Sequence, residues 1–389
     1  MCQPGLTRRS ASPVGRRFPS FLWLTRGASA LLALQAACGI QSPTDPAGPT
    51  SARTGDAPAL TGATATAVFP KEPPTSVQAR GDARGLNASG RMTGAVHGLV
   101  DDISDVRPYR WASASGAVMI AGCCDSGWGA DINDAGVVAG TTQQSLVVGA
   151  RAFVAAGASL VSLPILPGAD PERNAGAVAI NGFGQIAGYS PSAEGTFVRH
   201  AVLWSPSGAI QDLGTLGGTN STAIDVNDGG QVIGSSQVAG DAATHFFVWS
   251  ASGGMQDLEA LLGPITSVVE INAAGQIIGT RTTAGGASQA FLYTPGTGVR
   301  DLGTLGGSTS VPTGLNDAGQ VVGSSTTASG ETHAFFWTTQ GMQDITAIAG
   351  ITNVGRLNHR LQTVSGYVAP GTMPDLSSAT IPRLVQLDF

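Results

Sequence analysis

The chain contains 389 residues with a net charge of −6, 12% charged residues, 6% aromatic residues and 55 glycines. The acidic balance leaves no basic surface of the kind that binds nucleic acid, and therefore argues against a nucleic-acid partner. Many glycines and few charges favour short strands joined by turns over a helical enzyme.

Residues 1–38 have the features of an export signal. Two arginine pairs supply positive charge, and the apolar segment from Ala28 to Ala37 is too short to cross a bilayer. The stretch Leu34-Gln-Ala-Ala-Cys38 resembles the lipobox of bacterial lipoproteins, although Gln35 stands where that motif prefers Leu. The resemblance implies that Cys38 is acylated. A plain cleaved signal and twin-arginine export are the alternatives.

Residues 39–75 are rich in Pro, Thr, Ser, Ala and Gly, which predicts a disordered tether. The stretch Thr64 to Phe69 is a candidate exception, because it could add a strand to the last repeat and close a ring. The last repeat also has a candidate final strand of its own, Arg383 to Leu387. The sequence leaves the mode of closure open.

Residues 76–389 form a tandem repeat with a period near 45 residues. Each unit has an Asn, then Gly or a substitute three residues later, and then an apolar run that ends in Gly. Successive anchors are separated by 46, 48, 46, 45, 44 and 42 residues. The anchors are Asn87, Asn133, Asn181, Asn227, Asn272, Asn316 and Asn358. The first and seventh units diverge most, as terminal repeats often do.

Within a unit, the pattern indicates four short antiparallel strands. The Asn-Asp-Ala-Gly sequences at 133–136 and 316–319 predict type I turns between the first two strands. The third strand ends on an aromatic residue: Trp111, Trp204, Trp249, Tyr293 and Trp337. The predicted fold class is all-β, a seven-bladed β-propeller built from four-stranded repeats. A β-solenoid is the alternative.

Three segments of the sixth unit carry a family resemblance. They are Asp301-Leu-Gly-Thr-Leu-Gly-Gly307, Asn316-Asp-Ala-Gly-Gln-Val-Val-Gly323 and His333-Ala-Phe-Phe-Trp337. Together they resemble the HAF repeat of bacterial extracellular proteins. The likeness is close in the fourth to sixth units, partial in the second and third, and faint in the first and seventh. It implies an extracytoplasmic repeat protein and assigns no activity.

Several polar residues recur at fixed repeat positions. His200, His245 and His333 share one position, which Gln289 takes in the fifth unit. Equivalent positions are spread around a ring and Gln is a poor transition-metal ligand, so we interpret these side chains as repeated hydrogen-bonding groups. The acidic residues of the fourth strands are expected to cap the following turns or protect an exposed edge. They are Asp212, Asp257, Asp301 and Asp344.

The segments 131–136 and 225–230 are superficially similar to calcium-binding loops. An EF-type loop needs an acidic residue at its twelfth position, where this chain has Thr142 and Ser236. A hairpin turn explains both segments without an ion. The adjacent residues Cys123 and Cys124 are interpreted as a strained disulfide or free thiols. We therefore predict no metal, no cofactor and no catalytic residue.

Export, a tether and a repeat without a catalytic constellation predict a binding or scaffold module on the cell envelope. The protein is expected to be an outer-membrane lipoprotein or secreted, to touch the membrane by a lipid anchor at most, and to bind an unknown glycan or protein. One alternative is a polysaccharide hydrolase or lyase, with Asp125, Asp170 and Glu172 on the loops 121–129 and 164–174. Another is a purely structural surface repeat.

Overall fold

The structure is a computed structural model that describes residues 62–67, 80–97, 106–120, 126–143, 149–193, 197–346, 351, 354–368 and 380–388. The chain divides into two compact units, Met1–Arg53 and Thr54–Phe389, and every described residue belongs to the second. The predicted export signal, Cys38, Cys123, Cys124 and Asp125 lie outside the described residues.

Four antiparallel four-stranded sheets make up the middle of the chain. The first contains β10 (Gly176–Ile180), β11 (Ile186–Pro191), β12 (Arg199–Trp204) and β13 (Ile210–Asp212). The second contains β14 (Gly217–Val226), β15 (Val232–Val238), β16 (Thr244–Ser250) and β17 (Gly254–Asp257). The third contains β18 (Ser267–Ile271), β19 (Ile277–Thr282), β20 (Ser288–Thr294) and β21 (Gly298–Asp301). The fourth contains β22 (Gly306–Leu315), β23 (Val321–Thr327), β24 (Thr332–Thr338) and β25 (Gly341–Asp344).

The eight-stranded sheet that precedes them consists of two antiparallel groups of four strands, joined by one parallel pair, Val106 with Ser126. The first group is β2 (Arg80–Leu86), β3 (Met92–His97), β4 (Val106–Ala112) and β5 (Gly116–Met119). The second is β6 (Ser126–Ile132), β7 (Val138–Gln143), β8 (Arg151–Ala155) and β9 (Val161–Ser162). Two short helices, η1 (Ala239–Asp241) and α1 (Leu258–Leu262), complete the described elements outside the last sheet.

The last sheet joins the two ends of the second unit. It has the order β1 (Gly62–Ala67), β27 (Thr380–Asp388), β26 (Gln362–Val368). Strand β1 therefore lies inside the stretch 39–75 for which the sequence predicted a tether, and overlaps the candidate exception. The backbone of β1 satisfies the N–H and C=O groups of β27 along an edge that would otherwise be open.

In most repeats, the anchor Asn and the Gly three residues later form the tight turn between the first two strands. In the fourth repeat, the carbonyl of Asn227 accepts a hydrogen bond from Gly230 N at 3.0 Å, and its Oδ1 accepts one from Gln231 N at 2.9 Å. Gly230 has a φ of 71°, which glycine adopts without strain. The bond from the fourth residue to the first is the one expected of a β-turn.

The core lies between neighbouring sheets. Ile278 and Leu292 of one sheet pack against Val321, Phe335 and Trp337 of the next, and all five are buried. Trp204 and Trp249, which end their third strands in the same way, are buried too. Each sheet therefore buries an apolar face that it could not bury alone.

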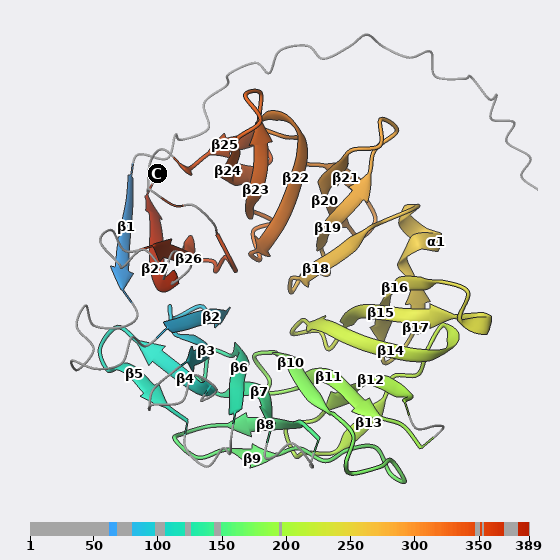
Figure 1. The fold of residues 1–389 in the computed structure, drawn as a ribbon. Helices are drawn as coiled ribbons and strands as arrows, with labels where there is room; N and C mark the ends of the chain where they lie inside the picture. The colour runs from blue at the N-terminus through green and yellow to red at the C-terminus, as the bar shows by residue number, and fades with distance from the viewer. Residues whose placement is uncertain are drawn as a thin grey trace, which may run out of the picture. The chain divides into compact units, whose positions relative to one another are not determined.

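A cycle of side-chain hydrogen bonds links the turns of all seven repeats. The amide Nδ2 of each anchor Asn donates to the backbone carbonyl of the next anchor, over distances of 2.8 to 3.5 Å. The last of these bonds runs from Asn358 back to Asn87. Consistent with this cycle, strands β6, β10, β14, β18 and β22 surround a common centre (Figure 1). The fold is thus all-β and built mainly from four-stranded groups.

Candidate functional site

The residue two positions before each anchor Asn differs in charge from one repeat to another. It follows a β-bulge in the first strand, for example between Gly129 and Asp131 or between Ala223 and Asp225. Three of the seven repeats have an acid here, three a small residue and one an arginine. In chain order they are Gly85, Asp131, Ala179, Asp225, Glu270, Gly314 and Arg356. We call Asp131, Asp225, Glu270 and Arg356 the axial cluster.

Arg356 lies among the three carboxylates of the axial cluster. Its Nη1 is 3.1 Å from Glu270 Oε1 and 3.8 Å from Asp131 Oδ2, and its Nη2 is 3.9 Å from Asp225 Oδ1. All three acidic residues are buried. One guanidinium thus contacts acidic side chains from the second, fourth and fifth repeats.

Each of these carboxylates also accepts a hydrogen bond from the backbone of the repeat that follows. The donors are Ile180 N to Asp131 at 3.1 Å, Ile271 N to Asp225 at 2.9 Å and Leu315 N to Glu270 at 2.8 Å. A buried N–H without such an acceptor would be costly. The acidic residues of the axial cluster therefore connect neighbouring repeats.

Burial is the main influence on the pKa values of the three acidic side chains in the axial cluster. It raises the pKa of Asp225 to about 6 and that of Glu270 to about 8, against the opposing effect of Arg356. Burial also raises the pKa of Asp131. For Arg356, burial alone would lower the pKa, but the three carboxylates raise it above its usual value. Burial thus favours the protonated form of all three acidic side chains, and Arg356 opposes it.

The axial cluster was not predicted from the sequence. The pattern around Asp131 and Asp225 was interpreted as a hairpin turn, whereas the structure places both residues on the strands before the turns, facing Arg356. Glu270 showed no pattern with other glutamates, because its equivalents are aspartates and an arginine. The signal that could have found the cluster is a charge at one repeat position with opposite sign in the seventh unit.

The anchor turns and the axial cluster line a cavity of about 200 Å³, which we call the axial cavity. Asp134, Asp228 and Asp317 line it, and each accepts a hydrogen bond from the backbone of the preceding turn at 2.7 to 3.0 Å.

Among the described residues, no group of His, Cys, Asp or Glu is arranged to hold a metal ion. Nor, in the same part of the chain, is any helix long and apolar enough to cross a membrane.

The histidines of the repeats pair with the acidic residues of the fourth strands. The Nδ1 atoms of His200, His245 and His333 lie 2.8, 2.7 and 2.6 Å from carboxylate oxygens of Asp212, Asp257 and Asp344, respectively. In the fifth repeat Asp301 pairs instead with Arg281, at 2.6 Å. Each pair lies within its own sheet, so the histidines do not converge on one centre.

These acidic residues also accept backbone hydrogen bonds just beyond their strands. Asp212 accepts from Gly214 N, Asp344 accepts from Thr346 N, and Asp257 caps helix α1. The hydrogen bond with Asp257 raises the pKa of His245. The turn contacts of these acidic residues were predicted from the sequence, whereas their pairing with the histidines was not.

The acidic residues considered for a hydrolase lie apart from the axial cavity. Asp170 accepts hydrogen bonds from Glu172 N at 2.8 Å and from Arg173 Nε at 3.3 Å, and both acidic residues are exposed. Neither residue lines the axial cavity. The structure therefore does not bring them together with the axial carboxylates.

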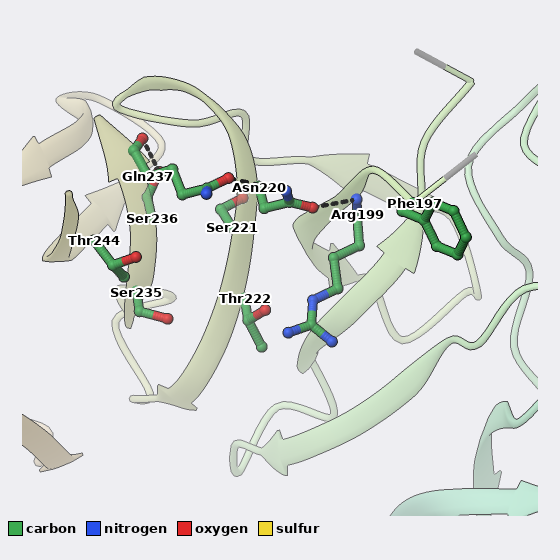
Figure 2. Close-up of a pocket in the computed structure, with 9 residues that line it drawn as sticks. All are labelled: Phe197, Arg199, Asn220, Ser221, Thr222, Ser235, Ser236, Gln237 and Thr244. Atoms are coloured by element: carbon green, nitrogen blue, oxygen red, sulfur yellow. Dashed lines mark hydrogen bonds between the residues drawn. The ribbon is translucent and has the colours of Figure 1, made fainter. Parts of the chain in front are cut away.

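A second, larger cavity of about 390 Å³ is a polar groove near the other end of the strands (Figure 2). It is formed by the ends of β14, β15 and β16 and by Phe197 and Arg199 at the start of β12. None of the described residues that line it carries a carboxylate. We call this cavity the polar groove.

No family model matches the chain, and no curated protein matches it. Solved structures that it resembles include TolB from Acinetobacter baumannii, with 12% identity and a TM-score of 0.44 over 65% of this chain and 62% of that one. The β-propeller domain of the Trilobed protease from Pyrococcus furiosus has 9% identity and a TM-score of 0.47 over 68% and 82%. A prolyl endopeptidase has 10% identity and a TM-score of 0.52 over 80% and 50%.

The match thus spans less than two thirds of the TolB chain and half of the prolyl endopeptidase. At such low identities the likeness concerns the fold alone. This chain has an all-β fold of mainly four-stranded sheets, and a β-propeller domain is among the solved structures that it resembles.

Proposed function

We propose that the second unit is a seven-bladed β-propeller. The cycle of seven anchor hydrogen bonds supports this count, with one anchor per repeat and the last bond returning to the first. The seventh blade would combine β26 and β27 with β1 and with the segment 354–357, whose Gly355 N donates to Val364 O at 2.7 Å. An experimental structure with any other number of blades would refute the proposal.

We further propose that this protein belongs with the HAF-repeat proteins and acts outside the cytoplasm. The export features of residues 1–38 and the repeat strings support this location. Fractionation of cells that produce the wild type and Cys38→Ala tests the anchor. Loss of the protein from the membrane fraction in the variant is expected, and an unchanged distribution would exclude acylation at this residue.

We propose that the function is binding or scaffolding on the cell envelope. The observation that carries this proposal is the engagement of the axial carboxylates: each accepts a backbone hydrogen bond and contacts Arg356. Most glycoside hydrolases need a pair of carboxyl groups that face the substrate. The polar groove offers a surface for a ligand, and the described residues that line it include no carboxylate.

The test is a binding screen of the purified full chain against envelope glycans, secreted polymers and envelope proteins, with product analysis for every ligand bound. Binding without chemical change supports the proposal. Cleavage of a polymer would overturn it, most directly if Asp170→Asn abolished cleavage and kept binding. A chain that bound nothing would leave only the structural role and would also overturn the proposal.

A further inference from the structure

The polar groove has walls held in place by a dense set of hydrogen bonds. Asn220 Oδ1 accepts from Arg199 N at 3.0 Å, and Asn220 Nδ2 donates to Gln237 Oε1 at 2.9 Å (Figure 2). Ser221 Oγ accepts from Ala201 N at 2.8 Å. A ligand would therefore meet a surface that is already ordered, which lowers the entropy cost of binding.

One face of the sheet in the groove presents a compact set of polar groups. Thr222 pairs with Ser235 across β14 and β15, and Gln237 pairs with Thr244 across β15 and β16. Because side chains alternate along a strand, Ser235 and Gln237 point to the same side. Among the described residues, none of the three hydroxyl groups, nor the Gln237 amide nitrogen, has a hydrogen-bond partner. These are donors and acceptors that suit the hydroxyl groups of a sugar.

Arg199 gives the groove its charge. It is the only charged residue among the described residues that line the groove, and its guanidinium lies 5.3 Å from the centre of the Tyr189 ring. Within the described part of the chain, this guanidinium makes no ion pair with a carboxylate. A guanidinium matches the planar geometry of a carboxylate and binds it through two parallel hydrogen bonds.

The groove also contains an exposed aromatic side chain. The Phe197 side chain is 84% exposed, and the guanidinium of Arg173 lies 4.8 Å from the centre of its ring. Exposed aromatic rings in a polar cavity commonly mark a binding surface, since they offer a flat apolar area. The C–H-rich face of a pyranose ring is a suitable partner for that area. The volume of about 390 Å³ falls within the range of small-ligand sites.

We propose that the polar groove binds a carboxylate-bearing saccharide, a uronic-acid segment of a polysaccharide. This inference rests on the proposed binding function and names its site and ligand class. Arg199 takes the carboxylate, the hydroxyl and amide groups around Ser235 take the sugar hydroxyls, and Phe197 packs on the ring face. The described residues that line the groove include no acid–base pair, so the proposal is that the saccharide is bound and not cleaved.

The experiment is isothermal titration of the full chain with a galacturonic acid hexamer, its carboxyl-reduced neutral counterpart and a polysulfated hexamer. The uronate hexamer is expected to bind, and Arg199→Gln is expected to weaken it about 10- to 100-fold. Ser235→Ala and Phe197→Ala are expected to weaken it several-fold. Arg300→Gln is the matched control, because Arg300 also lies over an aromatic ring, Trp337, but outside the groove. It should leave affinity unchanged.

Five outcomes would overturn the inference. Equal affinity for the neutral hexamer would show that no carboxylate is recognised, and equal affinity for the polysulfated hexamer would show a general anion surface. Uronate binding that survives Arg199→Gln and Ser235→Ala together would place the site elsewhere. If another envelope ligand binds and uronates do not, this inference fails and the proposed function stands; if nothing binds, both fail. Unfolding midpoints of the variants confirm that each one is folded.

Discussion

The side-chain amide of Asn358 donates a 2.9 Å hydrogen bond to the carbonyl oxygen of Asn87, across 271 residues of sequence. Asn358 Oδ1 also accepts from the N–H groups of Arg360 and Gln362. Asn358→Ala would leave these buried or half-buried groups without partners, so the free energy of unfolding should fall by about 2–4 kcal/mol. Urea denaturation measures the loss. Ser89→Ala, at an exposed turn position, is the control. A loss no larger than that of the control would show that the cycle contributes little.

Arg356→Met should destabilise the protein by about 3–5 kcal/mol at pH 7.5, since it leaves buried carboxylates without their cation. The deficit should shrink at pH 5, where protonation removes much of the buried negative charge. Unfolding of the variant and the wild type at both pH values measures this change. Arg360→Met is the control, because Arg360 is exposed in the same repeat. An equal deficit at both pH values would mean that the axial cluster acts through packing alone.

The raised pKa of Glu270 predicts how the free energy of unfolding depends on pH. Its pKa is raised to about 8 in the folded state, so between pH 4.5 and 8 the folded protein binds a proton that the unfolded chain releases. Glu270 thus lowers the free energy of unfolding as pH rises through this window, by at most about 1.4 kcal/mol per pH unit.

Glu270→Gln removes that dependence, because Gln has no proton to lose. The difference in unfolding free energy between variant and wild type should shift in favour of the variant from pH 5 to pH 8.5. Chemical denaturation at several pH values measures it. Glu331→Gln, at a largely exposed side chain, serves as the comparison. Parallel pH profiles for Glu270→Gln and the wild type would contradict the prediction.

Gly319 ends its anchor turn with a φ of 73°, and an added Cβ would lie 3.0 Å from Gln276 Oε1. Gly319→Ala should therefore reduce the free energy of unfolding by about 1–2 kcal/mol. Gly285→Ala is the control, because Gly285 has an ordinary φ and its nearest neighbour, Thr283 Oγ1, is 3.9 Å away. Thermal unfolding distinguishes the two variants. If both lose the same stability, the left-handed backbone is not the cause.

The repeat order, the turns and the aromatic ends of the third strands could be predicted from the sequence because each depends on residues a few positions apart. Asn227 and Gly230 form a turn locally, whatever the rest of the chain does. Leu361, which replaces the turn glycine of the seventh repeat, takes a φ of 61°. The contacts around this turn, including the hydrogen bond from Asn358 to Asn87, therefore hold it although its residue disfavours that backbone.

The axial cluster could not be found in the same way, since Arg356 and Asp131 are far apart in sequence and meet only after the cycle closes. The groove has the same difficulty. Arg199 and Ser235 belong to different repeats and line one cavity only because those repeats lie side by side. Local patterns predict the repeat, whereas these sites depend on how the repeats are placed.

The pairing of β1 with β27 has a mechanical consequence. Six residue pairs, from Gly62 with Asp388 to Ala67 with Arg383, join the start of the second unit to its end. A force applied to the chain before Gly62 acts first on the β1–β27 pairing and only afterwards on the other sheets. The first step of such an opening is therefore the separation of six backbone pairs.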